Sequence, residues 1–198
     1  MSERCYLTIL GLPAVGKSSV AKHVASTLGF SVASSGEVLR TLAAERGQAL
    51  EKRSDYASFQ RQVRHDLGET ALIDMLLATP GDGLVIDSVR NIGDYIRFKQ
   101  VGGQSIALFC DPRISYGFAS KRRDIKDSIG TEEEFVAACR AEYHETLPNG
   151  QTDPYGLHTY TIMLNADHII PADVSLGVVK KEVMAVIEQH VLKLPLDT

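Results

Sequence analysis

The chain of 198 residues contains no tryptophan and only three cysteines, Cys5, Cys110 and Cys139. The cysteines are odd in number and far apart, and none has the spacing of a CxxC redox motif or of a metal site. This scarcity excludes a disulfide framework and a cysteine-based zinc site as the basis of the fold. We therefore expect reduced cysteines that pack in the interior of a cytoplasmic protein.

The sequence also lacks a long apolar run and an excess of positive charge. No stretch approaches the roughly 18 apolar residues of a membrane span, and the charged residues Glu3 and Arg4 lead directly into the first expected strand, so we expect neither membrane insertion nor export. The net charge of −4 disfavours a protein that coats nucleic acid, although a local basic patch is compatible with a DNA contact. With 44% hydrophobic residues, we expect one domain over residues 1–198.

The most informative stretch is GLPAVGKS, residues 11–18, which we call the P-loop. It follows the apolar run 6–10 and opens an amphipathic segment, which predicts the order strand, loop, helix. In such a loop, backbone N–H groups surround a polyphosphate at the amino end of the helix. Lys17 is expected to reach the β- and γ-phosphates, and Ser18 to offer a hydroxyl to Mg²⁺. The predicted nucleotide-binding residues are Pro13, Ala14, Val15, Gly16, Lys17, Ser18 and Ser19.

A second metal ligand is predicted at the end of the apolar run 84–87, which follows the turn sequence Pro-Gly-Asp-Gly. A run of this kind is typical of a strand buried on both faces of a parallel sheet. Asp87, at its carboxyl end, would then face the P-loop and hold Mg²⁺ directly or through water.

The rest of the chain alternates apolar strand-like runs with helical ones. Strands are expected at 6–10, 30–33, 84–87, 104–110 and 168–170, with an additional strand at 159–164. Helices are expected after the P-loop, at 37–42, 54–79 and 92–100, from Pro112 into the basic cluster 121–127, from the capping box Thr131–Glu134, and after 171. This order predicts an α/β fold, a parallel five-stranded sheet with helices on both faces.

Three further segments have expected roles. The cluster 121–127 lies between two helices and would form a small helical lid over about 121–131, which closes over the phosphates. Residues 148–156 are rich in turn formers and are expected to form an exposed loop. His158 and His168 are isolated in the sequence, and we interpret them as structural residues rather than metal ligands.

Five motifs carry a family resemblance: GLPAVGKSSVAKHVA, SSGEVLR, LVIDSVRN, KRRD and EEFVAACRAEYH. Together they make nearly the whole chain similar to the nucleoside monophosphate kinase group of phosphate-loop proteins. The closest members are the adenylate-kinase-related and dephospho-coenzyme-A-kinase-like proteins. The resemblance implies this group's fold, ATP and Mg²⁺ as co-substrate and cofactor, and an acceptor-binding segment over about 34–80.

The resemblance also implies roles for single residues. It makes four residues ligands of the acceptor's phosphate: Ser35, Gly36, Arg40 and Arg90. It makes Arg122 or Arg123 the lid arginine, and Arg140 the arginine that bridges the two phosphates. The chain departs from the family pattern where Ile125 follows Asp124, at Pro171, and in a longer connection over 148–160, whose role stays undetermined.

These features predict an ATP- and Mg²⁺-dependent phosphotransferase that acts on a nucleotide-type acceptor. The favoured acceptor is a (deoxy)nucleoside monophosphate. The predicted catalytic residues are Lys17, Asp87, Arg122, Arg123 and Arg140. A hydroxyl acceptor, on dephospho-coenzyme A or on a hydroxymethylpyrimidine in a nucleotide or in DNA, would need a carboxylate as base, and Glu37 or Asp87 is the candidate. A nucleotide-dependent switch without kinase activity is the alternative from another class. The missing Asn-Lys-x-Asp motif disfavours its GTPase version.

Overall fold

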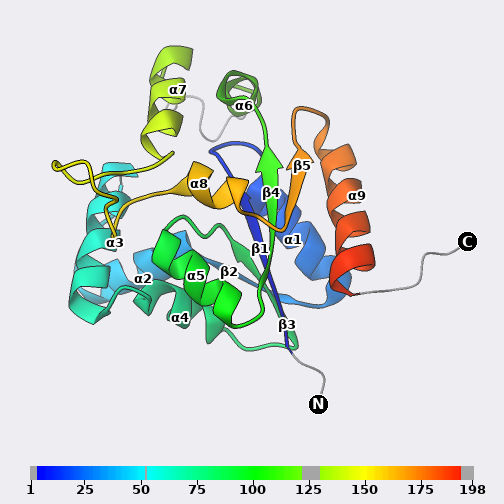
Figure 1. The fold of residues 1–198 in the computed structure, drawn as a ribbon, viewed down its shortest axis with the longest axis horizontal. Helices are drawn as coiled ribbons and strands as arrows, with labels where there is room; N and C mark the ends of the chain where they lie inside the picture. The colour runs from blue at the N-terminus through cyan, green and yellow to red at the C-terminus, as the bar shows by residue number, and fades with distance from the viewer. Residues whose placement is uncertain (1–3, 52, 122–129, 193–198) are drawn as a thin grey trace, which may run out of the picture.

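The computed structural model describes residues 4–51, 53–121 and 130–192 (Figure 1). Within these residues, five parallel strands form one sheet in the order β2-β3-β1-β4-β5. The strands are β1 Cys5–Gly11, β2 Ser31–Ser34, β3 Gly83–Asp87, β4 Gln104–Phe109 and β5 His168–Pro171. The predicted five-stranded parallel sheet is therefore confirmed.

The central strands are covered on both faces. Leu84, Val85 and Ile86 of β3 are fully buried, as are Ile106, Ala107 and Leu108 of β4. Such continuous apolar runs are typical of a parallel sheet between two layers of helices. The sheet therefore lies in the middle of the core, and its carboxyl edge carries the loops that form the site.

The helices lie on both sides of this sheet (Figure 1). Helices α1 (Lys17–Leu28) and α9 (Leu176–Val186) pack against each other on one face, and α9 continues as a π-helical turn, Ile187–Val191. The connection from β3 to β4 runs across the sheet in the opposite direction to that from β1 to β2, so right-handed crossovers place its helix on the other face. That face carries α4 (Ala71–Leu77), α5 (Ile92–Gln100) and α8 (Thr159–Leu164).

The remaining helices stand near the carboxyl edge. Helices α2 (Ser35–Glu45) and α3 (Arg53–Leu67) pack on α4 around a small apolar cluster of their own. Helices α6 (Pro112–Ala119) and α7 (Glu132–Ala141) pack against each other. The capping box predicted at the start of α7 is confirmed: Glu134 N donates to Thr131 Oγ1 over 3.2 Å, and Thr131 N donates to Glu134 Oε2 over 2.8 Å.

The strand expected at 159–164 is wrong, because this segment is helix α8. Thr159, Ile162 and Met163 are buried and have the spacing of one helical face, which packs on β1 and β4. A run of six apolar and β-branched residues does not by itself distinguish a strand from a short buried helix.

The single helix expected over 54–79 is also wrong. The chain leaves α3 at Gly68, whose φ of +109° lies in the left-handed region, and α4 starts three residues later. Glycine adopts this conformation without the steric cost of a Cβ atom, so it commonly ends helices.

Helix α6 ends at Ala119, before the basic cluster that we expected it to enter. The predicted lid arginines, Arg122 and Arg123, lie outside the described residues. Cys110 and Cys139 are buried and Cys5 is half-buried, as expected of packing residues. Of the helices in the described part of the chain, none combines the length and the apolar character of a membrane-spanning segment.

Candidate active site

The P-loop depends on unusual backbone conformations at several positions. Gly11 has a φ of +152°, and a Cβ atom there would lie 2.7 Å from Val15 Cγ2 and 2.9 Å from the carbonyl oxygen of Leu108. Gly16 has a φ of +91° and begins helix α1. Both glycines are therefore required by the path of the loop, as the sequence motif predicts.

Two residues other than glycine adopt positive φ angles in the part of the chain that the structure describes: Ala14, at +64°, and Ser88, at +75°. Ala14 lies in the P-loop, and Ser88 directly follows β3. Strained backbone of this kind persists where the surrounding structure enforces it, and it concentrates at functional sites. The two strained residues lie in the two loops that meet at the carboxyl edge of the sheet.

Lys17 is nearly buried, and its ammonium group lies against the P-loop itself. Its Nζ atom donates a hydrogen bond of 2.7 Å to the carbonyl oxygen of Leu12. This contact places a positive charge beside the loop's backbone amides at the amino end of α1, where an anion is favoured.

A cavity of about 550 Å³ opens between the P-loop and helices α2 and α3. Four P-loop residues line one wall, and Ser34, Ser35, Gly36 and Leu39 line the wall around the start of α2. Tyr56, Ala57 and Gln60 of α3 line a third side. The lining is completed by Asp87, Arg90, Glu142 and Leu157.

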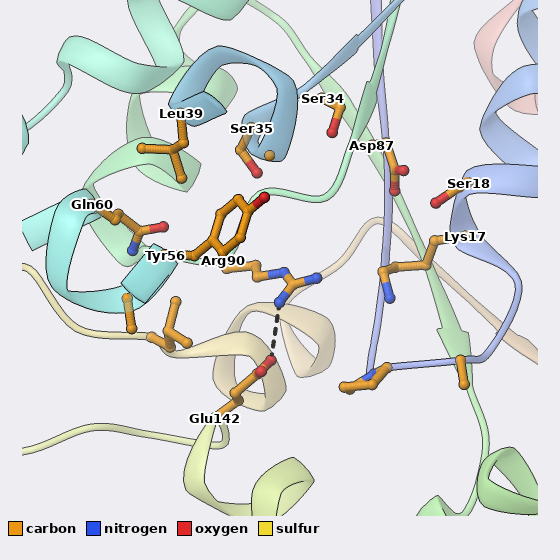
Figure 2. A pocket seen from close by; sticks show the side chains of 15 residues that line it. Lys17, Ser18, Ser34, Ser35, Leu39, Tyr56, Gln60, Asp87, Arg90 and Glu142 are labelled. Carbon is orange, nitrogen blue, oxygen red and sulfur yellow. Dashed lines mark hydrogen bonds and ion pairs between the residues drawn. The ribbon is translucent and has the colours of Figure 1, made fainter. Parts of the chain in front are cut away.

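Figure 2 shows Ser18 and Asp87 close together beside Lys17, on the side of the cavity opposite the Tyr56 ring and the Gln60 amide. Ser18 is at the start of α1, and Asp87 is the last residue of β3. A hydroxyl and a carboxylate are hard oxygen ligands, which suit Mg²⁺ when phosphate oxygens and water complete its coordination. The donor set therefore fits the predicted metal.

Arg90 enters the cavity from the loop after β3 and is oriented by two neighbours. Its Nε atom donates to Ser88 Oγ over 3.3 Å, and Nη1 lies 3.3 Å from Glu142 Oε2 in an ion pair (Figure 2). Glu142, directly after α7, is 4% exposed. Strained Ser88 thus holds the arginine on one side and Glu142 holds it on the other.

A second hollow, of about 460 Å³, adjoins the other side of the P-loop. The loop side contributes Val15, Gly16 and Ser19, and α6 contributes Phe118. The opposite side is formed by Ala172, Val174 and Ser175, which follow β5, and by Leu176 and Val179 of α9. The P-loop therefore stands between two hollows, one on each side.

The chain is similar to known proteins in sequence and in fold. A family model described as an AAA domain matches residues 10–104. The chain is 30% identical over 116 residues to a cytidylate kinase of Archaeoglobus fulgidus, a match that covers 59% of this chain and 61% of that relative. It is 26% identical over 168 residues to a cytidylate kinase of Methanosphaerula palustris, covering 81% of this chain and 88% of the relative. The match to the Archaeoglobus fulgidus relative therefore spans less than two thirds of that relative's length.

The crystal structure of shikimate kinase from Bacteroides thetaiotaomicron superposes with a TM-score of 0.59, over 96% of this chain and 99% of that one, at 13% sequence identity. This similarity shows the fold. The chain is thus similar in sequence to these kinases and has the fold of the P-loop kinases. Its five-stranded parallel sheet is part of this fold.

Most residues predicted for the P-loop kinase site do line one of the two hollows. The cavity contains Pro13, Ala14, Lys17, Ser18, Ser35, Gly36, Asp87 and Arg90. The second hollow contains Val15, Gly16 and Ser19. Residues separated by up to about 75 positions in the sequence are thus brought together at the carboxyl edge of the sheet.

Of the predicted site residues that the structure describes, three line neither of these two hollows. Arg40 is exposed at its margin, where its Nη1 atom donates to the Tyr56 hydroxyl over 3.4 Å. Glu37 is exposed on α2. Arg140 lines a separate surface hollow with Arg113 and the first turn of α7. Arg140 and the cavity residue Glu142 are two positions apart, which corresponds to about 200° around a helix axis, so their side chains point to different sides.

Seven cavity residues were not among the predicted site residues: Ser34, Leu39, Tyr56, Ala57, Gln60, Glu142 and Leu157. The sequence contains a signal for two of them, Tyr56 and Gln60. Their spacing puts them on the same helical face as the buried residues Phe59 and Val63. Glu142 and Leu157 lie in segments whose place beside the P-loop depends on the tertiary fold.

Proposed function

We propose that this P-loop kinase transfers the γ-phosphoryl group of ATP to a nucleoside monophosphate. One observation carries the proposal: a single cavity joins the P-loop residues Lys17 and Ser18 to Arg90 and the start of α2. A phosphate donor bound on one side would face a phosphate-bearing acceptor on the other. In-line phosphoryl transfer requires this arrangement.

The donor would place its polyphosphate in the P-loop and its nucleoside in the second hollow. Backbone amides and the positive end of the α1 dipole favour the phosphate charge, and Lys17 adds a full charge. Phe118 and Leu176 offer apolar surface to the base and ribose. Pro171, where the family pattern has an asparagine, leaves polar recognition of the base to the backbone groups after β5.

Mg²⁺ would be held by Ser18 and Asp87 together with phosphate oxygens and water. When bound, it supplies positive charge that neutralises the charge developing on the transferring group.

The acceptor's phosphate would bind Arg90, which is already oriented by Ser88 and Glu142. Arginine suits this role because its planar guanidinium binds two phosphate oxygens at once. Ser35 and Gly36, at the amino end of α2, favour the same negative charge. Arg40, at the margin of the cavity, would reach the phosphate only after releasing Tyr56.

The acceptor's base would lie in the slot between α3 and Leu157. Its walls are the Tyr56 ring and the apolar side chains of Ala57 and Leu157, and the Gln60 amide offers one donor and one acceptor to a base edge. Relatives named cytidylate kinase support a pyrimidine nucleotide as the acceptor.

Catalysis would then consist of positioning and charge, because the loose transition state of phosphoryl transfer spreads charge over the equatorial oxygens. Lys17 contacts the transferring group, and Arg90 aligns the attacking oxygen. Arg122 or Arg123 would complete the positive surroundings from the lid. A phosphate acceptor is already anionic, so no general base is needed.

A hydroxyl acceptor is the second candidate, because two carboxylates, Asp87 and Glu142, line the same cavity. Either could take the proton of a hydroxyl group. Glu37 is exposed on α2 and does not line the cavity, which leaves these two as the candidates.

The test is a panel of acceptors with ATP and Mg²⁺: the nucleoside monophosphates, dephospho-coenzyme A, and DNA that contains hydroxymethyluracil. We expect the highest kcat/KM with a pyrimidine monophosphate. Lys17→Ala should lower turnover by about 10³-fold or more, whereas Lys181→Ala, at an exposed position of α9, should not. Transfer to a hydroxyl acceptor alone would establish the second candidate, and slow phosphate release without any transfer would indicate a nucleotide-dependent switch.

A further inference from the structure

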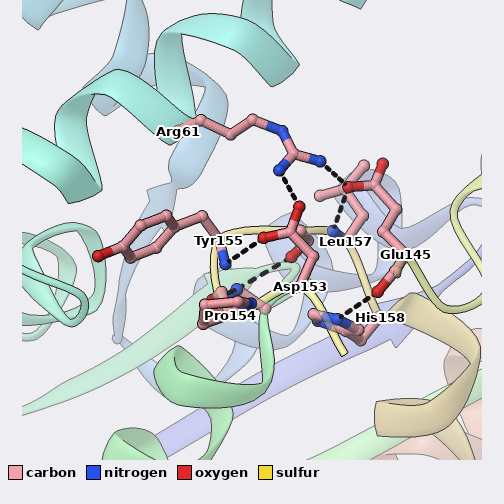
Figure 3. A network of polar contacts seen from close by, with 9 residues as sticks. Arg61, Glu145, Asp153, Pro154, Tyr155, Leu157 and His158 are labelled. Atoms are coloured by element: carbon pink, nitrogen blue, oxygen red, sulfur yellow. Dashed lines mark hydrogen bonds and ion pairs between the residues drawn. The ribbon is translucent and has the colours of Figure 1, made fainter. Parts of the chain in front are cut away.

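Residues 145–158 form a compact loop between α7 and α8, which we call the strap (Figure 3). Its two ends are hydrogen-bonded to each other, since Glu145 N donates to Leu157 O over 2.9 Å and Asp153 N donates to Glu145 O over 3.0 Å. An isolated antiparallel bridge joins Thr146 and Thr152. The longer connection seen in the sequence is thus an ordered element.

Residues of the loop after β3 form hydrogen bonds with one side of the strap. The Asn91 side chain donates to the carbonyl oxygens of Pro154 and Gly156, over 2.7 Å and 2.9 Å. The backbone N–H of His158 donates to Arg90 O over 2.8 Å, and the His158 side chain is fully buried. The strap is therefore attached to the residue that we assign to the acceptor's phosphate and to the residue after it.

The other side of the strap is held by Arg61 of α3. Figure 3 shows its guanidinium between two carboxylates of the strap, paired through Nη1 with Asp153 and through Nη2 with Glu145. The planar fork of arginine suits two such partners. Burial would raise the pKa of Asp153, but hydrogen bonds from Arg61 and from Tyr155 N outweigh burial and lower this pKa below its ordinary value.

One of the carboxylates that Arg61 binds is itself hydrogen-bonded to a residue that lines the cavity. The Glu145 carboxylate that pairs with Arg61 also accepts a hydrogen bond of 3.0 Å from Leu157 N, and Leu157 lines the cavity. On α3, Tyr56, Ala57 and Gln60 line the opposite side within about one helical turn of Arg61. Arg61 therefore joins the two walls between which the acceptor's base would lie.

We propose that Arg61 is a positioning residue for the acceptor: by clamping the strap to α3, it sets the width of the slot between Leu157 and the α3 side chains. The proposal rests on the proposed function, because it takes this slot as the place of the acceptor's base. Without Arg61, the carboxylates of Glu145 and Asp153 would lose the cation that they share. Solvent could not replace it well at Asp153, because this residue is only 5% exposed. The strap would then move away from α3 and the slot would widen.

Kinetics with acceptor and ATP varied separately test this role. We expect Arg61→Ala to raise KM for the acceptor roughly 10-fold, with kcat and KM for ATP changed by less than about 2-fold. Arg61→Lys should recover part of the loss, because a lysine binds one carboxylate at a time. An unchanged acceptor KM, or equal increases in both KM values, would overturn the proposal.

The chain offers a matched control in Arg97 of α5. Its ion pair with Asp74 also joins two helices, and its side chain is 42% exposed, against 40% for Arg61, but neither partner lines the cavity. Arg97→Ala should leave the acceptor KM unchanged. If it raises this KM as much as Arg61→Ala does, the effect is general loosening and the proposal fails.

Gly156→Ala tests the same contacts from inside the strap. A Cβ atom at Gly156 would lie 2.8 Å from both Cβ and Oε2 of Glu145, so it would displace the carboxylate that binds Arg61. We expect this variant to raise the acceptor KM as well. An unchanged acceptor KM in a folded Gly156→Ala protein would count against the clamp.

Hydrogen–deuterium exchange separates this proposal from the kinase proposal, because it needs no turnover. In the full-length protein, Arg61→Ala should increase exchange in residues 145–158 and in α3 at least about 5-fold, and Arg97→Ala should not. If no acceptor is phosphorylated but this exchange pattern appears, the proposed function fails and the clamp stands. If exchange in the strap is unchanged, the clamp fails whatever the activity.

Discussion

Arg90 and Glu142 form an ion pair inside the cavity, with 3.3 Å between Nη1 and Oε2. They are 52 positions apart in the sequence, one after β3 and the other after α7. The Glu142 side chain is 5% exposed and that of Arg90 is 30% exposed, so the pair lies at the cavity wall with the arginine more open to solvent. A buried carboxylate thus orients the arginine that we propose to bind the acceptor's phosphate.

Removing the charge of Glu142 should distinguish the two kinds of acceptor. With a phosphate acceptor, Glu142→Gln loses one orienting ion pair and should lower kcat/KM by about 10-fold, mainly through KM. With a hydroxyl acceptor for which Glu142 is the base, kcat itself should fall by 10²-fold or more. The control is Glu133→Gln, an exposed position on α7, measured in the same steady-state assay.

Gln60 should decide which acceptor is preferred. Gln60→Leu removes the hydrogen-bond donor and the acceptor of the Gln60 amide from the slot. It should raise the acceptor KM on the order of 10-fold, while KM for ATP stays the same. Gln62→Leu is the matched control, because Gln62 is exposed on the same helix and does not line the cavity. If the wild type and Gln60→Leu had the same order of preference among the nucleoside monophosphates, this role would be contradicted.

The first glycine of the P-loop should be required for stability. Gly11→Ala places a Cβ atom 2.7 Å from Val15 Cγ2 and 2.9 Å from Leu108 O, so it should lower the free energy of unfolding by about 1–3 kcal/mol. Gly117→Ala, in α6 with no atom within 4 Å of the new Cβ, should raise it by about 0.5–1 kcal/mol. Urea unfolding monitored by circular dichroism measures both. A Gly11→Ala protein as stable as the wild type would show that the loop can adopt another path.

The buried His158 should make stability depend on pH. Burial, first, and the neighbouring His144, second, lower the pKa of His158 below 6.5. As the pH falls through 6.5, the unfolded chain therefore binds a proton that the folded protein does not, and the free energy of unfolding decreases by at most about 1.4 kcal/mol per pH unit. Above pH 6.5 this contribution is constant.

Replacing His158 should reduce that dependence. His158→Asn should flatten the dependence of the unfolding free energy on pH between pH 6.5 and 5. The measurement is chemical denaturation at closely spaced pH values. Parallel slopes for the wild type and His158→Asn would refute the assignment to His158.

Much of the fold follows from local patterns. The apolar runs of β3 and β4 are long enough to predict buried strands, and Asn91 and Asp111 cap the helices that their positions indicate, since each side chain accepts from a backbone N–H at the start of α5 or α6. The prediction failed at α8, where a run of apolar and β-branched residues suits either a strand or a helix, and at Gly68, whose positive φ ends α3. At α8 packing against β1 and β4 decides the outcome, whereas at Gly68 a local glycine signal was overlooked.

The sequence by itself determined the phosphate end of the site. The P-loop is eight contiguous residues, and its conformation follows from two glycines and the start of a helix, so its geometry and its preference for anions are local properties. Asp87 could be added because the carboxyl ends of parallel strands meet at one edge of the sheet.

At the proposed acceptor end, the family resemblance pointed to Ser35, Gly36 and Arg90, but the contacts that orient this end were decided by the tertiary structure. Glu142 meets Arg90, and Arg61 meets Glu145 and Asp153, across 52 to 92 positions of sequence. Charges in separate helices and loops carry no periodic signal that pairs them, and only the packing of α3 and the strap around the cavity brings them into contact. Arg140, which the family resemblance had assigned to the site, lines a separate hollow with residues of α7 and Arg113.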